Sequence, residues 1–154
     1  MSTLLIYKKT NIFKTPCDAI VNTVNCVGVM GGGLAKAFRD RFPNMYEEYR
    51  DICRRKLLKP GQMHYYAPSI EYSKHIINFP TKNHWKYDSK MEYITTGLVA
   101  LKDCLITNKI NSVAIPALGC SLGGLNWEDV KKEIEAIDWG NIYVEVYEPW
   151  SERV

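Results

Sequence analysis

The sequence has few of the residues that build metal centres and disulfide frameworks. It contains three histidines and five cysteines, and no CxxC pair or zinc-type spacing links them. An odd number of unclustered cysteines is typical of free thiols in a reducing compartment. We therefore expect no metal ion and no other cofactor, and we expect the protein to be cytoplasmic.

Long apolar runs are also missing. No segment approaches the ~20 apolar residues that a membrane-spanning helix needs, and the run in MSTLLIYKKT is too short for a secretory signal. The formal net charge of +3 is far from the concentrated charge of a DNA-packing protein, but it permits a phosphate-bearing ligand. These features predict a protein without a membrane partner.

Repeats, low-complexity segments and Pro/Gly/Ser linkers are absent too. The length of 154 residues is that of one domain, and such a domain buries roughly 70% of the surface that its unfolded chain exposes. The composition, 46% hydrophobic and 24% charged, is ordinary for a soluble globular protein. We interpret residues 1–154 as a single domain, expect a monomer, and expect a core large enough to hold a preformed pocket.

Strands and helices are predicted to alternate along the chain. Apolar or alternating runs predict strands at residues 4–8, 18–25, 63–67, 75–79, 112–118 and 141–148. Helical spacing predicts helices at residues 34–42, 44–56, 89–108 and 127–137, the first ending near Pro43 and the second capped by Asn44. This order predicts an α/β fold, a three-layer α/β/α sandwich with a mixed, largely parallel central sheet. In such sheets ligands bind beyond the carboxyl ends of the strands.

Two glycine-rich turns each follow an apolar strand and precede a helix. They are VGVMGGGL, Val27–Leu34, and GCSLGGL, Gly119–Leu125. Glycine permits close backbone approach, so successive N–H groups can converge on an anion at a helix N-terminus. Neither turn matches a P-loop or the G-x-G-x-x-G fingerprint. Each alone is also explained as a tight turn, but two at one sheet edge would clamp a diphosphate from both sides.

Few side chains near these turns are of a type that could bind a sugar or catalyse a reaction. Asn22 and Asn25 would hydrogen-bond sugar hydroxyls, although asparagine also caps turns. Cys120 has no histidine and carboxylate near it in sequence, which disfavours a thiolate mechanism. Lys82 follows a predicted strand, where apolar neighbours would favour the neutral, nucleophilic amine and a phosphate would favour the charged form. From residue chemistry alone, Lys82 is explained better as a solvated surface cation.

Three separated stretches resemble the macrodomain family of ADP-ribose-binding modules. They are DAIVNTVNCVGVMGGGLAKAF, PTKNHWK and IPALGCSLGGLNWEDV, in that order. The resemblance runs from about Leu4 to Tyr147, and it is greatest with the branch that contains the DarG antitoxins and the terminal ADP-ribose protein glycohydrolase. It implies a macrodomain fold, ADP-ribose as the ligand, and an activity that needs no metal.

The resemblance also implies a role for each matching position. Asn11 would bind the adenine and Ile12 would pack on it, while Asn22 and Asn25 would lie near the distal ribose. Lys82 matches the lysine to which glycohydrolases of this branch assign catalysis, by attack of a neutral amine on C1 of the distal ribose and hydrolysis of the resulting Schiff base. The two phosphate loops would supply the other substrate-binding positions, which are Val29, Met30, Gly31, Gly32, Gly33, Leu34, Gly119, Cys120, Ser121, Leu122, Gly123, Gly124 and Leu125.

Three features depart from the family pattern. Ser121 replaces a glycine that is common in the second loop, which would alter one backbone approach to phosphate. Gly123 stands where the protein glycohydrolase of this branch has a catalytic aspartate, and DarG-type enzymes also have glycine there. The sequence does not include the toxin-binding domain of full-length DarG-type antitoxins. We therefore expect either an excised domain or a stand-alone relative, such as a mobile-element or phage protein.

Three hypotheses about function remain open. The first is a glycohydrolase that uses Lys82 to remove ADP-ribose from single-stranded DNA, on a modified thymidine, and so reverses the mark of a DarT-type toxin. In that case Trp85, Lys86 and Lys90 would form a stacking and phosphate-steering edge, but they are equally well explained by ordinary packing and a solvated face. The second is a module that binds ADP-ribose without turnover. The third is a hydrolase of protein-linked ADP-ribose or of small ADP-ribose derivatives.

Overall fold

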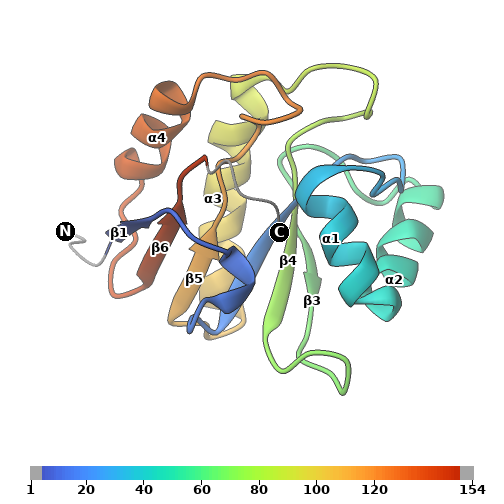
Figure 1. The fold of residues 1–154 in the computed structure, drawn as a ribbon, viewed down its shortest axis with the longest axis horizontal. Helices are drawn as coiled ribbons and strands as arrows, with labels where there is room; N and C mark the ends of the chain where they lie inside the picture. Colours follow the sequence, from blue (N-terminus) through green and yellow to red (C-terminus); the bar gives the residue numbers. More distant parts are fainter. Residues whose placement is uncertain (1–4, 150–154) are drawn as a thin grey trace.

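The computed structural model describes residues 5–149, in which six strands form one sheet. The strands are β1 (Leu5–Lys8), β2 (Ala19–Val24), β3 (His64–Tyr66), β4 (His75–Pro80), β5 (Ser112–Ile115) and β6 (Tyr143–Tyr147). Their order is β1-β6-β5-β2-β4-β3, and every neighbouring pair is parallel except β3 and β4 (Figure 1). The prediction of a mixed, largely parallel sheet is confirmed. Leu4, predicted to begin the first strand, lies outside the described residues.

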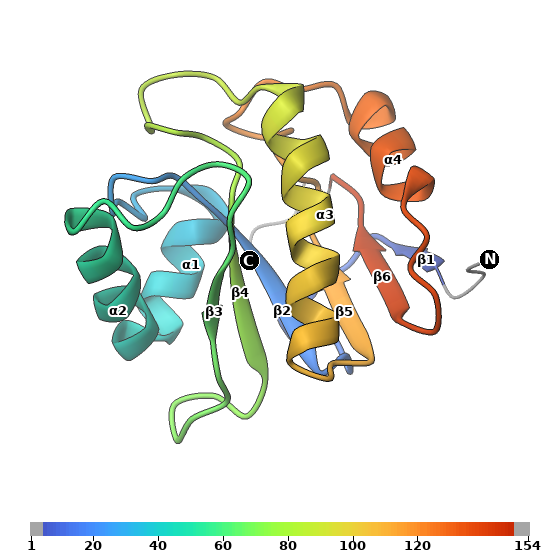
Figure 2. The ribbon, with the colours of Figure 1, turned by 180° about the vertical axis from the view of Figure 1, so that it is seen from behind.

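Helices cover both faces of the sheet, as predicted. The helices are the short 3-10 helix η1 (Ile12–Lys14) and the α-helices α1 (Gly33–Arg41), α2 (Pro43–Arg54), α3 (Met91–Thr107) and α4 (Trp127–Ala136). Helices α1 and α2 pack on one face, whereas α3 and α4 pack on the other (Figures 1 and 2). Two separate apolar clusters result, one on each side of the sheet. The three-layer α/β/α sandwich is therefore confirmed.

Strand β2 shows why this sequence builds a central strand. Its residues AIVNTV are buried except for Thr23. Successive side chains of a strand point to opposite faces. Accordingly Ala19 and Val21 join the cluster under α3 and α4, while Ile20 and Val24 join the cluster under α1 and α2. A strand that is apolar on both faces is stable only with helices on both sides.

The start of α2 differs from the prediction. Asn44 does not cap this helix, because the helix begins one residue earlier at Pro43, with Phe42 at the N-cap position. Proline suits the first helical position, since its fixed φ is helical and its missing N–H needs no partner there. The free N–H groups of Asn44 and Met45 donate instead to the carboxylate of Glu71, at 2.7 and 3.2 Å. Pro43 therefore starts a helix as well as ending the previous one.

The parallel strands place the ends of five segments along one edge of the sheet. Strands β1, β2, β4, β5 and β6 run in the same direction, so the loops after them meet at their carboxyl ends (Figure 1). Both glycine-rich turns and the loop with Lys82 belong to this set. None of the helices within residues 5–149 is long and apolar enough to cross a membrane.

Candidate functional site

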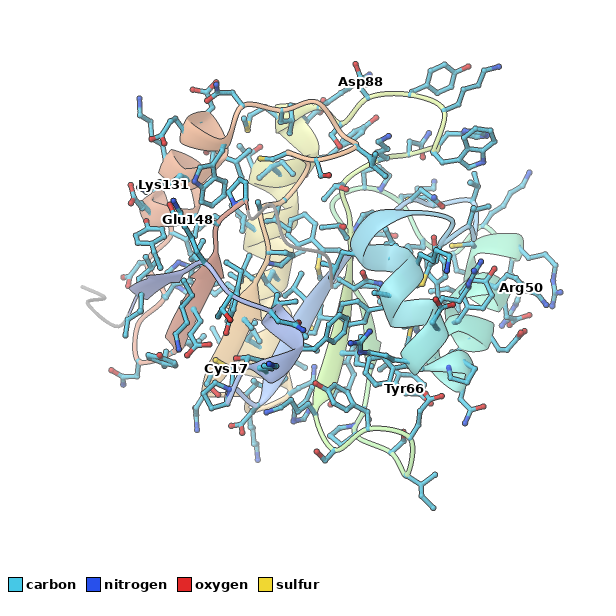
Figure 3. All side chains as sticks on the ribbon, viewed as in Figure 1. Cys17, Arg50, Tyr66, Asp88, Lys131 and Glu148 are labelled. Atoms are coloured by element: carbon cyan, nitrogen blue, oxygen red, sulfur yellow. The ribbon has the colours of Figure 1, made fainter. Side chains whose placement is uncertain are left out.

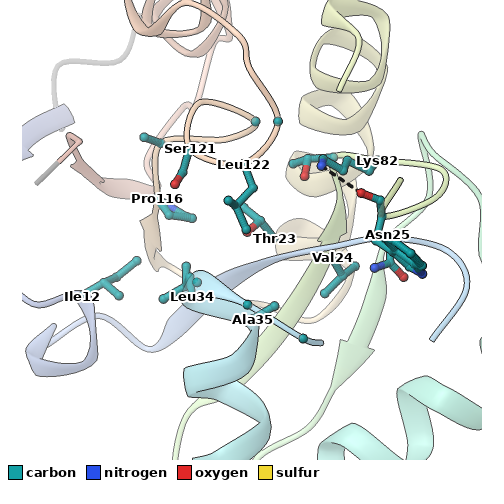
Figure 4. A pocket seen from close by; sticks show the side chains of 18 of the residues that line it. Ile12, Thr23, Val24, Asn25, Leu34, Ala35, Lys82, Pro116, Ser121 and Leu122 are labelled. Carbon is teal, nitrogen blue, oxygen red and sulfur yellow. Dashed lines mark hydrogen bonds between the residues drawn. The ribbon is translucent and has the colours of Figure 1, made fainter. Parts of the chain in front are cut away.

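A cavity of about 770 Å³ lies at the carboxyl edge of the sheet. Its volume is in the range of sites that bind small molecules and cofactors. Figure 4 shows Ile12 and Lys82 at opposite ends of the cavity, with Leu34, Pro116 and Ser121 between them. Twelve of the predicted site residues line it, which are Ile12, Asn25, Val29, Gly31, Gly32, Gly33, Leu34, Lys82, Gly119, Ser121, Leu122 and Gly123. The chain thus brings together residues from four separate stretches of sequence.

Asn25 shapes the first glycine-rich loop. Its side-chain oxygen accepts the N–H groups of Val27 and Val29 at 3.1 and 3.3 Å, and its amide nitrogen donates to the carbonyl of Val29 at 2.8 Å. The hydroxyl of Tyr49 lies 2.8 Å from the carbonyl oxygen of Asn25 and 2.9 Å from its side-chain oxygen. The asparagine therefore acts as a turn residue, which is one of the two roles expected of it, and it also lines the cavity.

Helix α1 begins against the cavity. Gly33, Leu34 and Ala35 form its first turn and all three line the cavity. The first N–H groups of a helix have no partner within the helix, and they carry the positive end of its dipole. Gly32, at the N-cap, provides no side-chain cap. This end of α1 is therefore suited to hold a phosphate group.

The second glycine-rich loop is closely packed. Gly119 has a φ of +72°, which favours glycine. A methyl group at Gly123 would overlap Ser89 Oγ and would lie 2.5 Å from the carbonyl oxygen of Gly119. Within the described residues, the backbone N–H groups of Ser121 and Leu122 donate to no other protein group, so they are free for an anion. Ser121 is not among the residues with positive φ, so the serine fits this loop without backbone strain.

Lys82 follows β4 and lines the end of the cavity opposite Ile12. Its ammonium nitrogen lies 3.3 Å from the carbonyl oxygen of Trp85, the bond drawn in Figure 4. In the part of the chain that the structure describes, no carboxylate lies within ion-pair distance of it. The only other charged side chain lining the cavity there is Glu148 (Figure 3), which contacts Trp127 Nε1 at 3.3 Å and Lys131 Nζ at 4.0 Å.

A buried carboxylate supports the end of the cavity near Ile12. Glu145 accepts hydrogen bonds from the hydroxyls of Thr15, Tyr143 and Tyr147 at 2.7–2.8 Å, and it lies 3.3 Å from Lys8 Nζ. Burial by itself would raise the pKa of this carboxyl, but these donors outweigh it and lower the pKa to about 2. Thr15 follows η1 and Tyr147 lines the cavity. Glu145 therefore joins two walls at this end.

The thiols do not offer a nucleophile. Burial raises the pKa of all five cysteines, including Cys120, whose pKa rises to about 11. The Sγ of Cys120 lies 3.4 Å from the carbonyl oxygen of Leu118, and the side chain does not line the cavity. A thiol in this state is protonated at neutral pH. Across residues 5–149 there is also no cluster of three or more histidine, cysteine or acidic side chains that would hold a metal ion.

Asn22 and Met30 do not line the cavity. Both are fully buried, and they lie near each other on the side of β2 that packs against α1 and α2. Asn22 donates to Asn78 Oδ1 at 3.0 Å, while its own side-chain oxygen has no protein partner among the described residues. The alternation Ile20, Asn22, Val24 already places this asparagine on a core face.

Four further predicted residues lie outside the cavity wall, namely Asn11, Cys120, Gly124 and Leu125. Asn11 accepts the N–H of Phe13 at 2.9 Å and thereby caps η1. Leu125 packs against the apolar cluster under α3 and α4. The ligand contacts predicted for these residues, and for those that line the cavity, stay predictions.

Several lining residues were not predicted from the sequence. Thr10, Thr23, Val24, Ala35, Thr81, Pro116, Ala117, Tyr147 and Glu148 belong to this group. Trp85, predicted only as an outer edge, also lines the cavity. Most of them occupy the last positions of parallel strands or the residues directly after. Because carboxyl ends of parallel strands share an edge, this position was the available signal.

Comparison with known proteins finds a matching family model and several similar proteins. The Macro domain family model matches residues 21–134. The DNA ADP-ribosyl glycohydrolase of Mycobacterium tuberculosis is 42% identical over 132 residues, which are 85% of this chain and 38% of that protein. The protein of the same name from Thermus aquaticus is 39% identical over 151 residues, or 95% of this chain and 41% of the relative. The chain thus spans about two fifths of the length of these curated relatives.

Solved structures agree with this relationship. The macrodomain of Mycobacterium tuberculosis DarG superposes with a TM-score of 0.88 at 38% identity, covering 97% of this chain and 98% of that one. Thermosipho africanus DarTG in complex with ADP-ribose gives a TM-score of 0.90 at 32% identity, covering 99% of this chain and 43% of the other. A curated Thermosipho africanus relative, 31% identical over 94% of this chain and 42% of its own length, is named a DNA ADP-ribosyl transferase-DNA ADP-ribosyl glycohydrolase fusion protein.

Proposed function

The chain belongs to the Macro domain family, and from this premise we propose that it removes ADP-ribose from single-stranded DNA by hydrolysis, with Lys82 as the nucleophile. The observation that carries the proposal is the position of Lys82. It is the only lysine that lines the described part of the cavity, and it lies at the opposite end from the predicted adenine position at Ile12. The names of the relatives support DNA as the substrate.

The cavity suits each part of ADP-ribose. Ile12 offers an apolar surface for the adenine at one end. The start of α1 and the second loop, whose Ser121 and Leu122 N–H groups have no protein partner among the described residues, line the middle, where the diphosphate would lie. The distal ribose would then reach Lys82 and Asn25. The cleaved bond, which joins C1 of this ribose to the base, would then lie at the cavity end near Trp85.

The proposed reaction has two stages. The neutral amine of Lys82 attacks C1, the bond from C1 to the base breaks, and the base leaves with the electron pair and takes up a proton. The sugar ring then opens to a Schiff base on Lys82. Water adds to the Schiff-base carbon, which releases ADP-ribose and restores the amine. Overall one water is consumed, and the products are free ADP-ribose and the unmodified base.

Gly123 supports the choice of lysine over carboxylate chemistry. An acidic side chain at this position would overlap Ser89 Oγ and the backbone of Gly119. The loop therefore has no room for the aspartate that protein glycohydrolases of the related branch use. We propose in addition that the protein acts as a cytoplasmic monomer and that it reverses the mark of a DarT-type toxin, a context supported by the fused relative.

One comparison tests the proposed function. Wild type, Lys82→Ala and Lys82→Arg are incubated with an oligonucleotide that carries ADP-ribosylated thymidine and with a protein ADP-ribosylated on glutamate. We expect wild type to release ADP-ribose from the DNA, and we expect both variants to lose at least 100-fold in rate while still binding free ADP-ribose in calorimetry. Arginine is the matched control, because it keeps the positive charge but offers no nucleophilic amine.

A trapping experiment separates mechanism from substrate. Reduction with cyanoborohydride during turnover should leave ADP-ribose on Lys82, detectable by mass spectrometry of the digested protein. If wild type binds ADP-ribose but leaves the DNA mark intact, the chain is a binding module or acts on another linkage, and the protein substrate distinguishes these two. If Lys82→Arg turns over as fast as wild type, the role of Lys82 is wrong.

A further inference from the structure

Two large aromatic side chains project from the loop between β4 and α3, beside the mouth of the cavity. Trp85 is 55% exposed and Tyr87 is 64% exposed. The ring of His84 lies between them, with centroid distances of 5.1 Å to Trp85 and 5.8 Å to Tyr87. Exposed clusters of this kind mark interaction surfaces, because exposure of so much apolar area to water is unfavourable.

The loop that carries these rings is held in place by hydrogen bonds. The N–H of Lys86 donates to His84 Nδ1 at 3.0 Å, and the N–H of Tyr87 donates to the carbonyl of His84 at 3.1 Å. At its two ends, the carbonyl of Asn83 accepts from Cys26 N at 3.1 Å, and Ser89 N donates to the carbonyl of Gly123 at 3.0 Å. The backbone that carries the rings is therefore held in one arrangement, which lowers the entropy that the loop loses on binding.

The surface is continuous with the catalytic end of the cavity. Trp85 lines the cavity, and its carbonyl oxygen is the hydrogen-bond partner of Lys82 Nζ. A group that leaves the cavity beside Lys82 would therefore pass the indole ring. His84 and Tyr87 extend the aromatic surface outward from there.

The positive charge of the loop favours the binding of a polyanion. Lys86 and Lys90 are exposed, and no carboxylate within residues 5–149 lies at ion-pair distance from either of them. Asp88, at the top of the loop in Figure 3, is the only acidic residue between Thr81 and Lys90. Its carboxylate is turned toward the second glycine-rich loop, 3.7 Å from where a methyl group on Gly124 would lie. Neither cation is thus neutralised by a carboxylate, although the Lys90 ammonium lies 5.8 Å from the centroid of the Tyr93 ring.

Resting on the proposed function, we propose that Trp85 and Tyr87 form a stacking platform for the unpaired base next to the modified nucleotide, while Lys86 and Lys90 contact the neighbouring phosphates. Flat exposed rings combined with basic side chains bind single strands with little sequence preference, because every base has a face that can stack. In a duplex these faces are already stacked and paired. The platform would therefore favour single-stranded over double-stranded substrates.

A matched pair of substrates tests the platform. One is ADP-ribosylated thymidine as a single nucleoside, and the other is the same modified thymidine within an oligonucleotide of about ten residues. For Trp85→Ala and Tyr87→Ala, we expect the ratio of kcat/KM on the oligonucleotide to kcat/KM on the nucleoside to fall about 5- to 100-fold below that of wild type. Ile70→Ala serves as the control, since Ile70 is an exposed apolar residue in the β3–β4 connection, and its ratio should equal that of wild type.

Salt dependence tests the two lysines. Lys86→Ala and Lys90→Ala should each reduce the slope of log affinity for an unmodified single strand against log salt by about 0.7, because each removes one phosphate contact. Lys132→Ala, which removes an exposed cation of α4, should leave the slope unchanged. A duplex of the same sequence should bind wild type more weakly than the single strand, and equal binding would contradict the stacking role.

The outcomes separate this proposal from the proposed function. If Trp85→Ala and Tyr87→Ala change both substrates equally, or neither, there is no platform. If wild type cleaves neither DNA substrate, the proposed function is lost, and binding of unmodified single strands measured by fluorescence anisotropy then decides the platform. At least fivefold weaker binding by both variants supports it, and equal binding overturns it.

Discussion

Ser89 packs against Gly123 and connects the loop between β4 and α3, which carries Lys82, to the second glycine-rich loop. The N–H of Ser89 donates to the carbonyl of Gly123 at 3.0 Å, and the Ser89 side chain fills the space that a side chain at position 123 would need. Ser89 Oγ is buried and has no hydrogen-bond partner within the described part of the protein. Two segments more than 30 residues apart, the loop that carries Lys82 and the second glycine-rich loop, are therefore held next to each other.

Gly123→Ala should disturb this packing. The new methyl group would overlap Ser89 Oγ and approach the carbonyl oxygen of Gly119, so we expect a loss of about 1–3 kcal/mol in the free energy of unfolding. Affinity for ADP-ribose should fall at least tenfold, because the loop must move. Urea unfolding and calorimetry measure the two effects. Gly31→Ala is the matched control, since its methyl group would meet only Val29 at 3.4 Å, and equal destabilisation by both changes would contradict the argument.

Asn25→Ala should loosen the first glycine-rich loop. It removes the hydrogen bonds to Val27 and Val29 and leaves the hydroxyl of Tyr49 with only the backbone carbonyl as a partner. We expect a cost of about 1–3 kcal/mol in stability and at least tenfold weaker binding of ADP-ribose in calorimetry. Tyr49→Phe removes one hydroxyl but keeps the loop bonds, so it should affect ADP-ribose binding much less. Similar affinities for both variants would mean that Asn25 does not organise the loop.

Glu145→Gln should change how stability depends on pH. The pKa of Glu145 is about 2 in the folded protein, below that of a carboxyl in the unfolded chain, so the folded state binds fewer protons here. This contribution is present above pH ~4.5 and is lost as the pH falls toward 2. We expect Glu145→Gln to be about 1–3 kcal/mol less stable at pH 7, with a smaller difference from wild type at pH 3. Urea unfolding at both values measures this.

A second substitution serves as the control for Glu145. Asp103→Asn removes an exposed carboxylate from α3, and it should shift stability by much less at both pH values. If the difference between wild type and Glu145→Gln were the same at pH 3 and pH 7, the buried carboxylate would not be ionised as described.

His64 should remain neutral at pH values at which an ordinary histidine is already protonated. Burial lowers its pKa, although the Glu48 carboxylate, 2.7 Å from Nε2, acts in the opposite direction. Its Nδ1 lies 2.9 Å from the side-chain nitrogen of Asn78, so it accepts this hydrogen bond and protonation would break it. Below about pH 6.5 the unfolded chain binds a proton at His64 more readily than the folded protein does. The free energy of unfolding should therefore fall as the pH drops below about 6.5. A ring-proton NMR titration checks this, and a midpoint at or above 6.5 would refute it.

Local patterns in the sequence determined most of the fold. The apolar run of β2 and the helical spacing of α3 each describe how one segment meets the core, so their type could be predicted without a partner. The beginning of α2 could not be predicted in this way. Its free N–H groups are satisfied by Glu71, which belongs to the β3–β4 connection and reaches them only after the chain has folded.

The candidate site also contains some residues that local sequence predicts and others that only the tertiary structure reveals. The two glycine-rich loops were predicted from their continuous motifs and Lys82 from the resemblance to the macrodomain family, and the structure places them around one cavity. Tyr147 and Glu148 lie in no such motif, and they reach the cavity because β6 is parallel to β5 and ends at the same edge. Asn22 also lies within a motif, but the alternation of β2 turns it into the core.

By itself, the sequence determined the elements and the sheet edge at which the candidate site lies, because these depend on periodicity and on the order of strands and helices along the chain. Lys82 was singled out by the resemblance of its motif to the macrodomain family, not by its residue chemistry. Only the tertiary structure decided which side chains line the cavity, that Ser89 excludes any side chain at Gly123, and that Trp85 and Tyr87 stand exposed beside Lys82. These relationships depend on distances between segments far apart in sequence, and such distances are set only when both faces of the sheet are packed.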